Sequence, residues 1–236
     1  MNVLAAGSLQ GVWPCLMAHS PCTEAISQTR FGPAGLLLES VLAGSHCDLF
    51  ASANQAHPQY LLTAGIAQYI RPFATNRLCL TVRSQACQHD DDWLTLLRRR
   101  DLRLATSTAG CDPSGDYALQ LFDLIARDHP ALARSLRQRA LPLVGGRHSL
   151  SAPPGQLAAS WLINQGHADM FIGYASYLPL LRQDPRLRVF TIPTRYNPPA
   201  IYTLAVLHPI AGELATYLTS AVAARVLSNA GFNQQQ

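Results

Sequence analysis

The chain has 236 residues, 48% of them hydrophobic and 14% charged, which is the composition of an ordinary globular protein and excludes extended disorder. Its formal net charge is +4, and all 18 basic residues are arginine. The one dense basic run, residues 98–100 with Arg103, is interpreted as a solvated helix end rather than a nucleic-acid surface. No apolar segment approaches the roughly 18 residues needed to span a bilayer.

The first 65 residues alternate between apolar strands and amphipathic helices. We expect strands at residues 3–6, 25–30 and 47–51, and helices at residues 9–17, 36–42 and 54–64. Pro14 should kink or restart the first of these helices. The alternation predicts a parallel sheet with helices on its faces.

The pattern changes to two extended runs at residues 69–73 and 78–82, and a second α/β series then begins. Its expected helices are residues 93–99, 115–127, 131–139 and 156–164, and its expected strands are residues 102–106, 168–173 and 187–192. A strand at 201–207 and one final helix at 209–229 follow Pro198 and Pro199. We therefore predict two α/β lobes, one formed by residues 1–80 with 197–236 and the other by residues 81–196.

Three turns between a strand and a helix share the same chemical character: Gly7-Ser8, residues 32–35, and Pro113-Ser114-Gly115. Open α/β sheets bind ligands at such strand ends. The turns offer hydroxyl and backbone N–H donors without a cation, which suits a compact, fully ionised oxyanion. If two lobes face each other, the turns converge on the cleft.

Two of the candidate residues have a purely structural alternative. Ser8 stands where a helix N-cap is expected, and local evidence alone favours that role for its hydroxyl. Tyr174, at the end of an expected strand, would by itself be interpreted as a packing residue with a satisfied hydroxyl.

Other chemistries have little support in the sequence. The dinucleotide motif GxGxxG, the P-loop and the nucleophile elbow GxSxG are all absent. A triad of Ser8 or Ser114 with one of the eight histidines is not supported by spacing. The segment from Cys87 to Asp92 is better interpreted as an acidic lead into the next helix than as a metal cluster. We expect a protein that is not an enzyme, with no cofactor and no bound metal cation.

The six cysteines lack any CxxC spacing. Cys47 and Cys79 lie in apolar runs and are expected in the core. A bridge between Cys15 and Cys22 stays open as an alternative. The chain begins almost directly with a strand and shows no basic leader, so we expect either a cytosolic protein or an exported one whose leader has been left out.

Five segments, in order, resemble the molybdate-binding (ModA-like) solute-binding proteins of ABC importers. They are AAGSL at 5–9, FGPAGL at 31–36, DLFASAN at 48–54, DPSGDY at 112–117 and ADMF at 168–171, and the terminal AGF at 230–232 continues the likeness. The resemblance implies a two-lobed periplasmic binding protein of type II, with a mixed sheet flanked by helices in each lobe. It also implies a monomer that closes over molybdate or tungstate in the interlobe cleft and passes it to a membrane permease.

The resemblance also implies a set of ligand-binding residues: Ser8, Ala34, Gly35, Ser114, Gln156 and Tyr174. Ser8 looks like the family's first hydroxyl ligand, Ser114 and Gln156 like backbone N–H donors, and Tyr174 like the phenol that closes the site. Ala34 falls where the family often has a second serine, which leaves only the N–H groups of Ala34 and Gly35.

The alanine at position 34 bears on the identity of the ligand. A lost neutral hydrogen bond costs about 1 kcal/mol, and more where a buried oxyanion oxygen is left unpaired. The alternative is therefore a sensor or binder of another small anion on the same fold: sulfate, phosphate, a phosphonate or a carboxylate.

Overall fold

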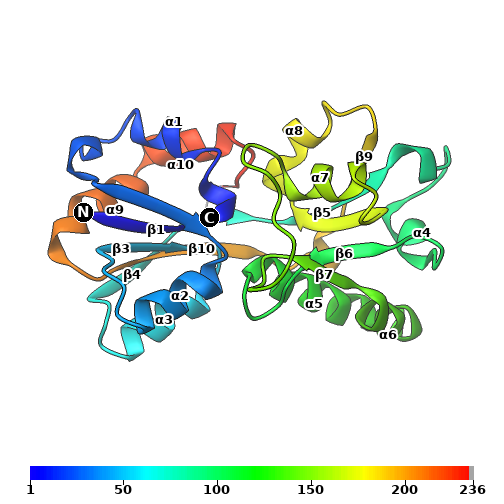
Figure 1. Cartoon of the computed structure of the whole chain (residues 1–236), viewed down its shortest axis with the longest axis horizontal. Coiled ribbons are helices and arrows are strands. Elements are labelled where there is room, and N and C mark those ends of the chain that lie inside the picture. Colours follow the sequence, from blue (N-terminus) through cyan, green and yellow to red (C-terminus); the bar gives the residue numbers. More distant parts are fainter. Residues whose placement is uncertain (234–236) are drawn as a thin grey trace. The chain divides into compact units, whose positions relative to one another are not determined.

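The computed structural model describes residues 1–233, which form two compact units (Figure 1). The first comprises Met1–Asn76 and the segment from Pro199 onward, and the second comprises Arg77–Pro198. Each unit has its own five-stranded mixed sheet with helices on both faces, so the predicted α/β class is confirmed. The boundary expected after residue 80 falls inside a strand that belongs wholly to the second unit.

The sheet of the first unit has the strand order β2-β1-β3-β10-β4. Its strands are β1 (Asn2–Ala6), β2 (Gln28–Gly32), β3 (Leu49–Ser52), β4 (Tyr69–Asn76) and β10 (Ala200–Val206). β1 runs parallel to both β2 and β3, whereas β10 is antiparallel to β3 and β4. With a strand on either side, β1 buries Val3 to Ala6 without interruption, which is why its sequence is a continuous apolar run.

The helices of the first unit lie on both faces of this sheet, with α2 and α3 on one face and α1, α9 and α10 on the other (Figure 1). They are α1 (Trp13–Met17), α2 (Ala34–Leu42), α3 (Ala56–Thr63), α9 (Gly212–Leu218) and α10 (Ala221–Asn229). The prediction of one helix over 209–229 is wrong, whereas the run over 9–17 restarts as α1 next to Pro14, as expected. Pro14 lies in the first turn of α1, where proline is tolerated, and Ser220 caps α10 by accepting from the Ala223 N–H.

The sheet of the second unit has the order β7-β6-β8-β5-β9. Its strands are β5 (Leu78–Arg83), β6 (Leu104–Ser107), β7 (Leu141–Val144), β8 (Met170–Tyr174) and β9 (Leu187–Thr191). Its helices are α4 (Trp93–Arg98), α5 (Pro113–Ala126), α6 (Pro130–Arg139), α7 (Ala158–Asn164) and α8 (Leu178–Leu181). β6 is parallel to both β7 and β8, and β5 is antiparallel to β8 and β9.

Several predicted boundaries are wrong for local reasons. β2 starts at Gln28 rather than 25 because Thr23–Ala25 form a 3₁₀ turn. β4 does not end at residue 73, because it continues to pair with β10 as far as Asn76 opposite Ala200. α7 begins at Ala158 rather than 156, after a turn in which the Gln156 N–H donates to the Pro153 carbonyl.

The cysteines are all free thiols. Cys47 and Cys79 are buried as predicted, and burial raises the pKa of both thiols to about 12, so they behave as small core residues. The alternative of a bridge between Cys15 and Cys22 is not realised, since Cys15 is an exposed thiol and Cys22 a buried one.

The acidic segment before Trp93 serves as a helix start, as expected. The Asp92 carboxylate caps α4 by accepting from the Thr95 N–H at 2.6 Å, and this bond lowers the pKa of that carboxyl. Across residues 1–233, no group of three or more His, Cys, Asp or Glu side chains could hold a metal ion. Nor does that part of the chain include a helix with the length and apolar character required to cross a bilayer.

Candidate functional site

Ser8 and the start of α2 lie beside each other because β1 and β2 are parallel neighbours. The register pairs Ala6 with Gly32, so the turns that follow the two strands start at the same level of the sheet. A Cβ on Gly7 would lie 3.7 Å from the Gly32 carbonyl oxygen, which shows how closely these turns approach. Two of the three turns singled out in the sequence therefore share one edge of the first sheet.

The N-terminus of α2 carries no side-chain cap. Its N-cap residue, Pro33, has neither a polar side chain nor an N–H. The first hydrogen bond of the helix runs from the Leu37 N–H to the Pro33 carbonyl, at 3.0 Å. The N–H groups of Ala34 and Gly35 therefore precede the first intrahelical bond, at the positive end of the helix dipole. Both residues are buried. This edge of the first unit thus presents neutral N–H donors.

The Ser8 hydroxyl is hydrogen-bonded to a buried tyrosine. Ser8 lies within the 3₁₀ turn Gly7–Leu9, whose N-cap is Ala6 and has no side-chain bond, so the N-cap interpretation of Ser8 is wrong. Its Oγ lies 2.7 Å from the Oη of Tyr202, and the Asn76 amide Nδ2 donates to the same Oη at 3.5 Å. Sequence analysis missed Tyr202 because no local pattern relates residues 194 positions apart.

The DLFASAN segment shapes the neighbouring turn after β3. The Ser52 hydroxyl donates to the Asn54 Oδ1 at 3.1 Å and lies 3.4 Å from the Nδ1 of His57. The same Asn54 oxygen accepts from the His57 N–H at 3.1 Å. These bonds fix the start of α3 and account for the polar residues there.

In the second unit, the predicted residues follow three neighbouring strands. Ser114 lies after β6, Gln156 on the segment after β7, and Tyr174 at the end of β8, and these strands are parallel neighbours in one sheet. Their carboxyl ends therefore meet at one edge. Tyr174 is buried, and the closing role predicted for its phenol stays a prediction.

The two predicted N–H donors of the second unit already have partners within the chain. The Ser114 N–H donates to the Asp112 Oδ1 at 3.1 Å, and the Gln156 N–H to the Pro153 carbonyl at 3.1 Å. The turn before α5 is also tightly closed, since a Cβ on Gly115 would lie 2.6 Å from the Ser107 carbonyl oxygen. A ligand that took the Ser114 N–H would have to replace Asp112.

Asp112 is the group at this turn that sequence analysis overlooked, although its position before a proline and a helix is typical of an N-cap. Burial raises the pKa of its carboxyl to about 6, against the lowering effect of hydrogen bonds from Ser114 and Ser107. Burial raises the pKa of the nearby Tyr177 phenol, and the negative charge of the Asp112 carboxylate raises it further. An acid that titrates near pH 6 thus occupies the N-terminus of α5.

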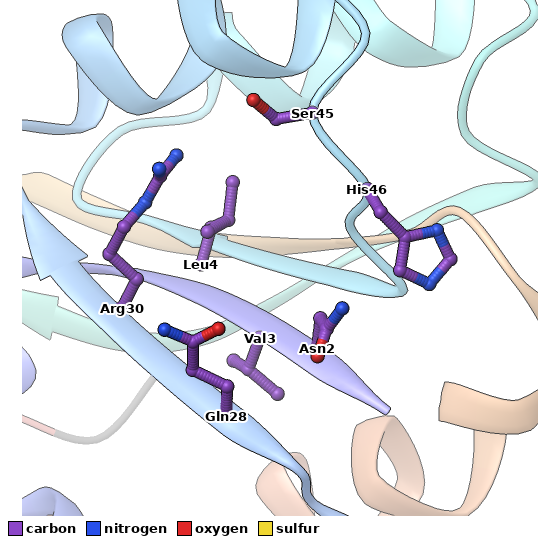
Figure 2. Close-up of a pocket in the computed structure, with 7 residues that line it drawn as sticks. All are labelled: Asn2, Val3, Leu4, Gln28, Arg30, Ser45 and His46. Carbon is purple, nitrogen blue, oxygen red and sulfur yellow. The ribbon is translucent and has the colours of Figure 1, made fainter.

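The pocket in Figure 2 lies elsewhere on the first unit. It has a volume of about 80 Å³ and is lined by residues at the amino end of β1, by Gln28 and Arg30 of β2, and by Ser45 and His46 of the loop before β3. The Arg30 guanidinium donates to the Ser40 hydroxyl, and His46 pairs with Asp48. Since Ser8 follows the opposite end of β1, this pocket is not the predicted site.

The sequence profile of the family described as bacterial extracellular solute-binding protein matches residues 19–233. The chain belongs to this family. An uncharacterized protein of Pasteurella multocida (strain Pm70) is 44% identical over 209 residues, which cover 87% of this chain and 86% of that protein. Because this family consists of solute-binding proteins, the match agrees with the expectation that the chain is not an enzyme.

Two solved structures of anion-binding proteins have a fold similar to that of this chain. The periplasmic molybdate-binding protein of Azotobacter vinelandii matches with a TM-score of 0.77 and 17% identity, over 100% of both chains. The sulfate-binding protein SubI of Mycobacterium tuberculosis H37Rv matches with a TM-score of 0.74 and 17% identity, over 99% of this chain and 86% of SubI. The resemblance to molybdate-binding proteins is thereby confirmed at the level of the fold.

Proposed function

We propose that this protein is the substrate-binding component of an ABC importer and that its ligand is a tetrahedral oxyanion, with molybdate and tungstate as the first candidates. The observation that supports this most is that the turn carrying Ser8 lies next to the uncapped N-terminus of α2. Both offer neutral donors, and a fully ionised oxyanion presents only acceptors. The helix dipole adds favourable potential at the same place.

We propose that the second unit supplies the remaining donors, from Ser114, Gln156 and Tyr174, and that hinge closure brings the two sets onto one ligand. For Ser114 this requires the Asp112 carboxylate to give up the N–H that it now accepts. Such an exchange replaces one anionic acceptor by another and keeps the N–H satisfied.

The proposed partner is the membrane permease of the importer, and the proposed location is the periplasm, where the protein would act as a monomer. The family description, bacterial extracellular solute-binding protein, supports an exported protein. A sensor with no role in transport is the alternative within the same fold.

A different small anion is the second candidate for the ligand. Ala34 offers no hydroxyl where the ModA-like proteins often have a serine, and a sulfate-binding protein has a similar fold. Phosphate, phosphonates and carboxylates belong to the same group of alternatives.

Isothermal titration with molybdate, tungstate, sulfate and phosphate tests the proposal. Because molybdate and tungstate have nearly the same size, they should bind with similar affinity, and the smaller sulfate should bind more weakly. Ser8→Ala should weaken binding, whereas Ser45→Ala, at the other end of β1, should not. Heat from none of the four anions contradicts the proposal, and preference for sulfate or phosphate supports the second candidate.

A further inference from the structure

Tyr202 is a buried phenol whose hydroxyl is directed at a predicted ligand-binding residue. The residue is 0% exposed and belongs to β10. Its ring packs edge-on against Phe73 and Phe232, with centroids 6.3 Å and 5.4 Å away. Its Oη lies 2.7 Å from the Oγ of the half-buried Ser8. The ring of Tyr202 is held by its aromatic contacts, whereas its hydroxyl contacts Ser8. A substitution can therefore remove the hydroxyl and leave the packing of the ring in place.

The Asn76 amide is a further hydrogen-bond donor to the Tyr202 hydroxyl. Its Nδ2 can only donate, and it does so to the Tyr202 Oη at 3.5 Å. In the 2.7 Å contact between the Tyr202 Oη and the Ser8 Oγ either atom can donate, and in one of the two arrangements the phenol donates its proton to the serine oxygen. The Ser8 proton then points away from Tyr202. This order leaves the serine hydroxyl as a donor with its own proton available for a further acceptor.

We infer that Tyr202 is a positioning residue for oxyanion binding: through the Asn76–Tyr202–Ser8 chain it holds Ser8 as a hydrogen-bond donor toward the ligand. The inference rests on the proposed function, in which Ser8 contacts an oxyanion. It also bears on the choice among the proposed anions. A serine fixed as a donor matches an oxygen that bears no proton, as in sulfate, molybdate or tungstate, and it opposes a P–OH group such as that of dihydrogen phosphate.

Tyr202→Phe is the direct test, because it removes the hydroxyl and keeps the ring between Phe73 and Phe232. Tyr217→Phe is the matched control: Tyr217 is also buried in the first unit, and its hydroxyl donates to the Leu16 carbonyl at 2.7 Å. Tyr202→Phe loses the phenol's bonds to Ser8 and Asn76, and Tyr217→Phe loses the bond to Leu16, so both variants should lose some stability. Only Tyr202→Phe should lower the affinity for molybdate, by about fivefold, the equivalent of one hydrogen bond.

Two further measurements separate positioning from a general loss of structure. In a Ser8→Ala background, Tyr202→Phe should have no additional effect on molybdate affinity, because the residue through which it acts is gone. At pH 6, the preference of the wild type for sulfate over phosphate should shrink in Tyr202→Phe and stay unchanged in Tyr217→Phe. These results together support the inference.

The contrary outcomes are distinct. If the wild type binds molybdate and Tyr202→Phe binds it as tightly as Tyr217→Phe does, the inference is overturned and the proposed function stands. Additive effects of Ser8→Ala and Tyr202→Phe also overturn it. If the wild type binds none of the four anions, the proposed function fails together with this role for Tyr202.

Discussion

Asn197 holds both backbone groups of Leu78 with one side chain. Its Oδ1 accepts from the Leu78 N–H at 2.9 Å, and its Nδ2 donates to the Leu78 carbonyl at 2.8 Å and to the Ile192 carbonyl at 3.3 Å. The two residues lie next to the points at which the chain passes from one unit to the other, Asn76–Arg77 and Pro198–Pro199. Asn197 therefore ties the two crossing segments together at the edge of the second unit.

Asn197→Ala should destabilise the second unit by about 2–4 kcal/mol, because Asn197 is buried and its loss leaves buried backbone groups of Leu78 unpaired. Urea unfolding followed by circular dichroism measures this change. Asn229→Ala, at the exposed end of α10, is the control and should stay within about 0.5 kcal/mol of the wild type. Equal stability of the two variants would contradict the role assigned to Asn197.

Asp112→Asn tests the acid at the start of α5. Burial raises the pKa of Asp112 from its ordinary 3.8 to about 6, so the folded protein holds this proton more tightly than the unfolded chain does. The contribution of Asp112 to the free energy of unfolding is therefore complete below about pH 4 and is lost as the pH rises through about 6. The difference of about two pKa units corresponds to at most about 3 kcal/mol.

Asparagine is also a good N-cap and does not titrate, so this variant keeps the cap and removes the pH dependence. The free energy of unfolding of the wild type, minus that of Asp112→Asn, should fall between pH 4 and pH 7. Comparing the two proteins cancels the opposite trend from carboxylates with lowered pKa, such as Asp169 and Asp184. A constant difference across this range contradicts the assignment.

Much of the fold could be predicted from the sequence because its signals are local. The apolar run of β1 and the small residues after it identify a buried strand and its turn. β7 was missed, because its four residues include Pro142, and a proline within a short run argues against a strand. The β-strand continuation to Asn76 was also missed, since it depends on pairing with residue 200.

The candidate site could be predicted only in part, for the same reason. Ser8, Ala34, Gly35 and Ser114 stand in turns that local sequence identifies. The contact of Ser8 with Tyr202 arises from the position of β10 in the sheet, and the capture of the Ser114 N–H by Asp112 depends on side-chain geometry. Neither has a signature in residue spacing.

Ser114→Ala and Ser114→Pro should have different effects on ligand binding. The predicted donor is the backbone N–H, which alanine keeps and proline removes. Proline is tolerated in the first turn of a helix, so α5 should still form. Titration with molybdate should show a mild effect for alanine and no binding for proline, with circular dichroism confirming that both are folded. Equal loss in both variants means that the turn is misassigned.

Ala34→Ser should restore the hydroxyl that the ModA-like proteins often carry at this position. Ala34 is the first residue of α2, is buried, and lies at the sheet edge shared with Ser8. One added hydrogen bond is worth about 1 kcal/mol, so molybdate and tungstate should bind about fivefold more tightly by titration. Ala43→Ser, just beyond the other end of α2 and exposed, is the control. If Ala34→Ser leaves molybdate binding unchanged while sulfate binds the wild type more tightly, the missing hydroxyl marks a site built for the smaller anion.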